Sequence, residues 1–221
     1  MAIADKNIYM REIVDKLNTH WPHNKTINMV CHGHSVPAGY FATPSVDTFN
    51  AYPHLFHKNL KQRFPYAVIN VIVTAIGGEH SQSGAERFEN DVLCHKPSVV
   101  TIDYSLNDRR LGIVEAKNAW RIMIEKALQN NVKLLLLTPT WDLSVNTDPQ
   151  GNNLSQLMLH TKQVRRLAEE YEVGLIDCFR IFEHYNQNNG DFTELMSWVN
   201  HPGRKGHELI ASELIRWFPI Y

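Results

Sequence analysis

The sequence predicts an α/β fold in which helices cover a parallel sheet on both faces. Short β-branched and apolar runs alternate along the chain with segments of helical periodicity, an alternation typical of parallel sheets. Residues 132–138 are nearly all apolar, as expected for a strand that is buried on both faces. No repeat, low-complexity tract or Pro/Gly/Ser-rich linker divides the chain, so residues 1–221 are expected to form one domain.

Five strands are expected where the apolar runs occur. They span residues 27–31, 67–74, 98–104, 132–138 and 173–177. Helices are expected where apolar residues recur near helical spacing. They span residues 6–18, 51–63, 84–94, 113–130, 153–171 and 206–217. Pro65 and Pro97 follow the second and third of these helices, where proline would end them.

The bulk composition narrows the class of protein. A hydrophobic fraction of 43% with 20% charged residues suffices for a proper core and argues against disorder. Lys and Arg number 22 against 23 Asp and Glu, a net charge of -1, so no basic surplus indicates nucleic acid or an anionic membrane as a partner. The pair Arg109-Arg110 is expected at solvated positions.

The cysteines and the N-terminal sequence indicate in which cellular compartment the protein is expected. Cys31, Cys94 and Cys178 form no CxxC pair, and an odd count argues against a full disulfide framework. The first residues contain no apolar signal region, and no stretch is long enough to span a bilayer. A location in the reducing cytoplasm is therefore expected.

Polar clusters follow the first three strands. They are Gly33-His34-Ser35, Gly77-Gly78-Glu79 and Leu106-Asn107-Asp108. Right-handed crossovers bring the carboxyl ends of parallel strands to one edge of the sheet, and ligands of open α/β sheets bind outside that edge. The sequence therefore places Ser35, Gly78 and Asn107 on a common rim.

Together with a late histidine, these residues supply the groups that acyl transfer needs. Ser35 offers a hydroxyl nucleophile, and Gly78 lets its N–H approach a ligand closely. The side-chain amide of Asn107 can donate to a developing negative oxygen. His201, in a loop before the last helix, can accept the serine proton. Each residue alone has an ordinary explanation as a cap or turn residue, so the hypothesis depends on the combination.

Other polar residues nearby are assigned structural roles. Asp108 is expected to brace its loop, and His207 fits a structural role better than that of a base. His32 and His34 occupy alternate strand positions, but no third ligand is near them, so no metal is expected. The loop after the first strand lacks a GxGxxG or GxxxxGK pattern, which disfavours a nucleotide or flavin binder.

The order of these pieces resembles the SGNH hydrolase superfamily, also called GDSL-like lipases and acylhydrolases. The resemblance spans residues 27 to about 212, and its blocks are Gly33-His34-Ser35-Val36, Ala75-Ile76-Gly77-Gly78-Glu79, Leu106-Asn107-Asp108 and His201-Pro202-Gly203-Arg204-Lys205-Gly206-His207. It implies a flavodoxin-like three-layer α/β/α sandwich and metal-free hydrolysis of esters or thioesters. In that pattern Ser35 is the nucleophile, Gly78 and Asn107 are oxyanion donors, and His201 is the base.

The chain departs from the family pattern at two positions. His34 stands where relatives usually have an aspartate that braces the nucleophile loop. Trp198 stands three residues before His201, at the position of the triad acid, and an indole cannot accept a hydrogen bond from imidazole. Three alternatives remain open: another carboxylate, a backbone carbonyl that leaves a Ser–His dyad, or loss of hydrolysis.

Three carboxylates are candidates for the missing acid: Asp142, Asp191 and Glu194. Asp142 follows the fourth strand and should reach the same rim. We expect it either to orient His201 or to contact substrate. A loop carboxylate that caps a turn is the alternative.

The sequence as a whole predicts a serine ester hydrolase without a cofactor. A small or short-chain ester, such as an acetyl group on a carbohydrate, is favoured as substrate because no apolar lid segment is visible. Tyr40, Trp141 and Trp198 are candidates to line the pocket, with core packing as the alternative role. The alternative, suggested by Trp198, is a catalytically impaired binding protein for carbohydrate or another ligand.

Overall fold

A computed structural model describes residues 2–188 and 190–221. Its central sheet has five parallel strands in the order β4-β1-β5-β6-β7. The strands are β1 (Ile27–Gly33), β4 (Ile69–Val73), β5 (Val99–Asp103), β6 (Lys133–Leu137) and β7 (Gly174–Ile176). The α/β fold and the five-stranded parallel sheet are confirmed. β4, β1 and β5 are neighbours, so the three polar clusters follow adjacent strands.

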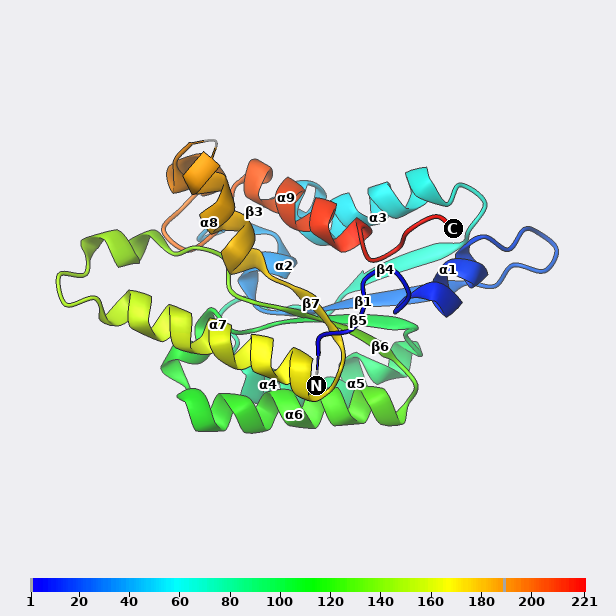
Figure 1. Ribbon diagram of the computed structural model, residues 1–221, viewed down its shortest axis with the longest axis horizontal. Coiled ribbons are helices and arrows are strands. Elements are labelled where there is room, and N and C mark those ends of the chain that lie inside the picture. Colours follow the sequence, from blue (N-terminus) through cyan, green and yellow to red (C-terminus); the bar gives the residue numbers. More distant parts are fainter. Residues whose placement is uncertain (1, 189) are drawn as a thin grey trace.

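Helices cover both faces of this sheet (Figure 1). On one side lie α3 (Tyr52–Arg63), α8 (Cys178–Asn188) and α9 (Arg204–Ile215), and α1 (Arg11–Leu17) packs into the same core. On the other side lie α4 (Ser81–Glu86), α5 (Phe88–Asp91), α6 (Ile113–Gln129) and α7 (Asn152–Glu170).

Strand β6 shows why its sequence is continuously apolar. Leu135 and Leu137 belong to the core under α3, α8 and α9, whereas Leu134 and Leu136 belong to the opposite core. Successive side chains of a strand point to opposite faces. Because helices cover both faces, no position among these four is available to a polar residue.

Several elements were absent from the sequence prediction. Helix α8 was missed, and the first helix begins at Arg11 and not at residue 6. A four-residue helix α2 (Ser35–Ala38) and a small antiparallel pair, β2 (Tyr40–Ala42) and β3 (Ser45–Val46), follow β1. Short 3-10 turns complete the described elements: η1 (Thr48–Asn50), η2 (Leu93–His95), η3 (Asn107–Arg110), η4 (Leu143–Thr147) and η5 (Phe192–Leu195).

The C-terminal segment docks on the chain itself. Trp217 and Phe218 are buried, and the Arg63 guanidinium donates to the carbonyl oxygens of Ile215 and Phe218 at 2.6 and 2.9 Å. None of the described helices combines the length and the apolar character that crossing a bilayer requires.

Candidate active site

Ser35 and His201 meet although 166 positions separate them in the chain. The Oγ of Ser35 lies 2.9 Å from the Nε2 of His201, within hydrogen-bond distance. Both residues are buried, with exposed fractions of 8% and 5%. The structure therefore brings together the two residues on which the acyl-transfer hypothesis depends.

The end of β1 fixes the position of Ser35. His34 N donates to the Asp103 carbonyl at 3.1 Å, which continues the pairing of β1 with β5. Ser35 then begins helix α2, which ends at Gly39 with a left-handed φ of 92°. Such a φ favours glycine, and it lets the chain turn sharply into β2.

His34 braces the start of helix α2. Its Nδ1 accepts from Val36 N at 3.1 Å and so caps helix α2. Its Nε2 lies 3.3 Å from the Asp103 carboxylate. An imidazole nitrogen therefore acts as the N-terminal cap of α2.

A narrow hairpin before α9 carries His201. Met196 bridges Pro202 in antiparallel fashion, and the N–H groups of Ser197 and Trp198 donate to the His201 carbonyl at 3.0 and 3.3 Å. Leu143 N donates to the Val199 carbonyl at 2.7 Å, which ties this hairpin to the loop after β6. One backbone bridge and three backbone hydrogen bonds thus fix the hairpin that holds the imidazole toward Ser35.

Gly78 and Asn107 stand at the same rim, as predicted. Gly78 has a φ of 83°, and a Cβ built on it would meet no atom within 4 Å. The conformation, and not a lack of space, is therefore what favours glycine there. The Asn107 side-chain N–H₂ donates to the Glu79 carbonyl at 2.8 Å. One hydrogen of the Asn107 amide thus links its loop to the loop that carries Gly78. The other hydrogen of this amide remains free for another acceptor.

Asp142 is buried close to this rim, but its hydrogen bonds go elsewhere than to His201. One carboxylate oxygen accepts from Ser144 N at 2.8 Å and caps η4. The other pairs with the Arg109 guanidinium. The turn-capping alternative is thus observed, together with an ion pair. The expectation that Arg109 is solvated was wrong, because its guanidinium is mostly buried against Asp142 and donates to the Leu106 carbonyl at 2.8 Å.

The other candidate acids are engaged away from His201. Asp191 accepts from Thr193 N at 2.8 Å, and Glu194 binds Lys205 and the Tyr185 hydroxyl, each at 2.7 Å. Trp198 is exposed. Within the described residues the buried Nδ1 of His201 has no hydrogen-bond partner.

The surroundings of His201 keep its imidazole neutral. Burial lowers the pKa of His201 below its ordinary value of 6.5, and a positive charge on His34 would lower it further. The negative charge of Asp142 acts in the opposite direction and raises this pKa. A neutral imidazole with an unprotonated Nε2 is the form that can accept the Ser35 proton.

Aromatic residues near the site have different roles. The Tyr40 ring stacks over His201 with centroids 6.3 Å apart and an interplanar angle of 29°. Trp141 instead packs in the core and stacks on Phe192 with ring centroids 3.9 Å apart, which is the core-packing alternative. Tyr40 thus covers the imidazole, whereas Trp141 supports the fold.

The structural roles that the sequence suggested for other polar residues are observed. Asp108 accepts from Ser81 N and Trp120 Nε1, both at 2.7 Å, and so braces the Asn107 loop. His207 Nδ1 accepts from Tyr52 N at 3.1 Å. His32 is surrounded by polar partners, with Nδ1 2.9 Å from the Thr74 hydroxyl and Nε2 3.1 Å from the Tyr104 hydroxyl. No group of three His, Cys, Asp or Glu in the described ranges could hold a metal ion.

A polar cavity of about 410 Å³ adjoins the site. Asn107 lines it, as does Asn200, which directly precedes His201. Most of the other lining residues are polar or charged, and the lining also includes Leu106, Arg109, Arg110, Asp142, Ser144, Asn153, Gln156 and Val199. Its composition suits a hydroxylated group better than a hydrocarbon chain.

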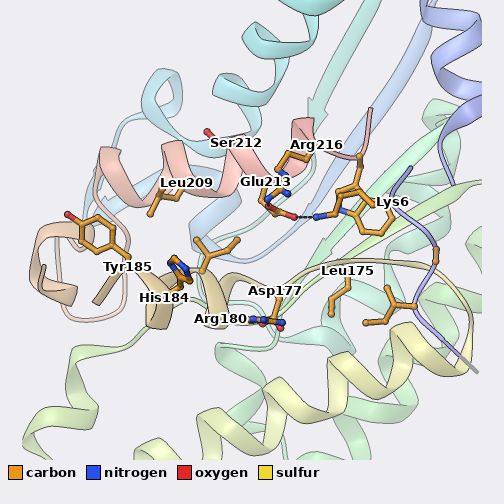
Figure 2. Close-up of a pocket in the computed structure, with 14 residues that line it drawn as sticks. Lys6, Leu175, Asp177, Arg180, His184, Tyr185, Leu209, Ser212, Glu213 and Arg216 are labelled. Atoms are coloured by element: carbon orange, nitrogen blue, oxygen red, sulfur yellow. Dashed lines mark hydrogen bonds and ion pairs between the residues drawn. The ribbon is translucent and has the colours of Figure 1, made fainter. Parts of the chain in front are cut away.

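A larger cavity, of about 710 Å³, lies elsewhere (Figure 2). It lies between the N-terminal segment, α8 and α9, and in Figure 2 Lys6 reaches toward its ion-pair partner Glu213. Neither Ser35 nor His201 lines it. Cavity size alone therefore does not locate the residues that acyl transfer needs.

Comparison with known proteins identifies the class. The model of the GDSL-like lipase/acylhydrolase family matches residues 31–209. The chain therefore belongs to this family, and it is a carboxylic ester hydrolase. The family resemblance inferred from the four blocks is confirmed.

Among characterised relatives, an acetylxylan esterase from Geobacillus stearothermophilus is 24% identical over 170 residues, covering 71% of this chain and 75% of that protein. A solved structure of an acetylxylan esterase from the same organism has a TM-score of 0.74 at 20% identity and covers 88% of this chain and 95% of the other. A two-domain esterase active on acetylated mannans has a TM-score of 0.74 at 21% identity. That match covers 95% of this chain but only 52% of the esterase, so this chain spans about half its length.

Solved structures of the Geobacillus esterase include catalytic mutants at a serine, an aspartate and a histidine, the aspartate three positions before the histidine. In the present chain the position three residues before His201 holds Trp198. This chain therefore has no carboxylate at that spacing before His201.

Proposed function

We propose that this protein is a serine esterase that removes acetyl groups from carbohydrates. The approach of Ser35 Oγ to His201 Nε2 at 2.9 Å is the observation that carries the proposal. The polar cavity beside Asn107 supports a hydroxylated alcohol portion. The similarity to an acetylxylan esterase and to an esterase active on acetylated mannans agrees with that substrate class.

In the proposed reaction Ser35 Oγ attacks the ester carbonyl carbon while its proton passes to His201 Nε2. The carbonyl oxygen gains negative charge, and the N–H groups of Ser35 and Gly78 and the free amide hydrogen of Asn107 donate to it. The tetrahedral intermediate then expels the sugar hydroxyl, which takes the proton from Nε2. Water attacks the acetyl-serine with His201 again as base, and acetate leaves.

Asp142 assists this reaction, in our proposal, through its charge. Without an acceptor at Nδ1, the imidazolium that forms during the attack would be poorly stabilised in a buried site. The negative charge of Asp142 already raises the pKa of His201. It therefore favours the protonated ring in the transition state, although its oxygens bind Arg109 and Ser144.

Kinetics with 4-nitrophenyl esters tests this function. The wild type is expected to cleave the acetate efficiently and to lose activity as the acyl chain lengthens. Ser35→Ala is expected to lose at least about a thousandfold in kcat, because removal of a triad nucleophile disables both chemical steps. Ser155→Ala, at an exposed position of α7, is the matched control. Turnover of Ser35→Ala near the wild-type rate would refute the mechanism, and a preference for long acyl chains would refute the substrate class.

A further inference from the structure

One of the arginine side chains that line the polar cavity beside Asn107, that of Arg110, has no carboxylate partner among the residues described. Arg109 and Arg110 both line it, together with a single carboxylate, Asp142. Asp142 is already engaged by Arg109 and by Ser144 N. Within the part of the chain that the structure describes, the exposed guanidinium of Arg110 makes no ion pair or side-chain hydrogen bond. The cavity therefore keeps a net positive charge although the whole chain carries -1.

Neutral hydrogen-bonding groups accompany this cation. Gln156, from the first turns of α7, and Asn200, from the His201 hairpin, line the same cavity, and neither side chain hydrogen-bonds to another described residue. Asn107 lines the cavity as well, but its free amide hydrogen is the one assigned to the oxyanion. These groups come from η3, α7 and the His201 hairpin, so a molecule in the cavity would contact three separate elements.

The place of the cavity relates it to the reaction. Asn107 is the proposed oxyanion donor, and Asn200 is the residue before the proposed base. Ser35 and His201 do not line this cavity, so it can hold only a part of the substrate that extends past Asn107 from the reacting carbonyl. The acetyl methyl group cannot form hydrogen bonds with a guanidinium or with amides, whereas the hydroxyl groups of a sugar ring can. The cavity volume of about 410 Å³ falls in the range of small-ligand pockets.

We infer that this cavity binds the alcohol portion of the substrate and that Arg110 selects a sugar bearing a carboxylate, such as an acetylated uronic acid. A guanidinium is planar and matches a carboxylate through two parallel hydrogen bonds. Arg109 is held in its ion pair, which leaves Arg110 free to make this contact. The inference rests on the proposed function and names the substrate class within it.

A matched pair of substrates tests the inference. One is the methyl glycoside of glucuronic acid acetylated at its ring hydroxyls, and the other is the methyl glycoside of glucose acetylated at the same positions. The wild type is expected to favour the acid in kcat/KM by about three- to tenfold, the range for a charge-assisted hydrogen bond that is partly open to solvent. The preference should shrink as salt is raised toward 1 M, where screening is strong.

Variants of Arg110 separate recognition from structure. Arg110→Gln is expected to abolish the preference for the acid, and Arg110→Lys to retain part of it, since a charge remains without the planar fork. Arg166→Gln removes a similarly exposed arginine of α7 outside the cavity and should keep the full preference. Equal kcat/KM for the two glycosides in the wild type, or an undiminished preference in Arg110→Gln, would overturn the inference.

Two further measurements distinguish failure of this inference from failure of the proposed function. Cleavage of 4-nitrophenyl acetate by the wild type reports the esterase itself, so cleavage without discrimination between the glycosides rejects only the uronate inference. Calorimetric titration of Ser35→Ala with both glycosides reports binding without turnover. Tighter binding of the acid, lost in Ser35→Ala/Arg110→Gln, supports the inference; equal binding rejects it.

Discussion

Arg109 joins the loop that carries Asn107 to the loop after β6 through its ion pair with Asp142. The guanidinium also donates to the Leu106 carbonyl, immediately before the proposed oxyanion donor Asn107. Since Leu143 in turn binds the hairpin that carries His201, a chain of contacts connects the proposed oxyanion donor with the proposed base. Asp142 thus occupies a position from which it affects both groups.

Asp142→Asn is expected to lower kcat by about tenfold or more. The variant loses the charge that favours protonated His201, and it weakens the contact with Arg109. Loss of the negative charge also lowers the pKa of His201, so the acid limb of the kcat/KM profile should move to lower pH. Asp191→Asn, which changes another turn-capping carboxylate, serves as the control. An unaltered rate with an unmoved acid limb would remove Asp142 from the mechanism.

Asn107→Ala is expected to reduce kcat by about a hundred- to a thousandfold, the usual effect of removing an oxyanion donor. The variant also loses the bond to the Glu79 carbonyl, so stability must be measured alongside. Asn70→Ala removes a comparable amide bond, from Asn70 to Asn28 at 2.9 Å on the sheet surface. If Asn107→Ala is no more impaired than Asn70→Ala, Asn107 is not an oxyanion donor.

The pH dependence of activity should reflect the lowered pKa of His201. The reaction needs neutral His201, so activity is complete above this pKa and is lost as pH falls through it. Because the pKa lies below 6.5, kcat/KM for 4-nitrophenyl acetate should still exceed half of its plateau value at pH 6.5. An acid limb with a midpoint above pH 6.5 would contradict the environment that we describe for His201.

Stability should decline in acid because three histidines are buried in neutral form. Burial lowers the pKa of His32 and of His160 to about 4 and that of His207 to about 3. The unfolded chain binds protons at these residues near pH 6.5 whereas the folded chain does not, so the free energy of unfolding falls as pH drops from 6.5 toward 4. Each histidine contributes a slope of up to about 1.4 kcal/mol per pH unit.

His160 offers a specific test of this acid sensitivity. Neither of its ring nitrogens has a partner among the described residues. His160→Leu should therefore reduce the slope of unfolding free energy between pH 4 and 6.5 by up to about 1.4 kcal/mol per unit, as measured by urea denaturation. Replacing the exposed His184 in the same way should leave the slope as it is. Equal slopes in wild type and His160→Leu would contradict a neutral, buried His160.

Much of the fold could be predicted from the sequence because periodicity reports burial. The run Leu134–Leu137 gave β6 correctly, since both faces of the sheet are covered. Helix α8 was missed although Phe179, Phe182 and Tyr185 recur every three residues and are all buried. That signal occupies only 11 residues and follows a strand of three residues, so it was easily overlooked.

Part of the candidate site could likewise be predicted from the sequence, and part could not. Parallel topology alone brings Ser35, Gly78 and Asn107 to one rim, so their neighbourhood could be inferred without coordinates. The ion pair of Arg109 with Asp142 could not, because it depends on side-chain directions in two loops that no periodicity constrains. For the same reason the sequence could not show that His201 Nδ1 lacks a hydrogen-bond partner among the described residues.

The central claim is that His201 activates the hydroxyl of Ser35. Reaction with a fluorophosphonate probe, followed by peptide mass spectrometry, measures this most directly, because the probe phosphonylates serines whose hydroxyl is activated by a base. We predict a single adduct on Ser35 in the wild type and its loss in His201→Ala. Absence of the adduct from folded wild-type protein, or equal labelling in His201→Ala, would contradict the account.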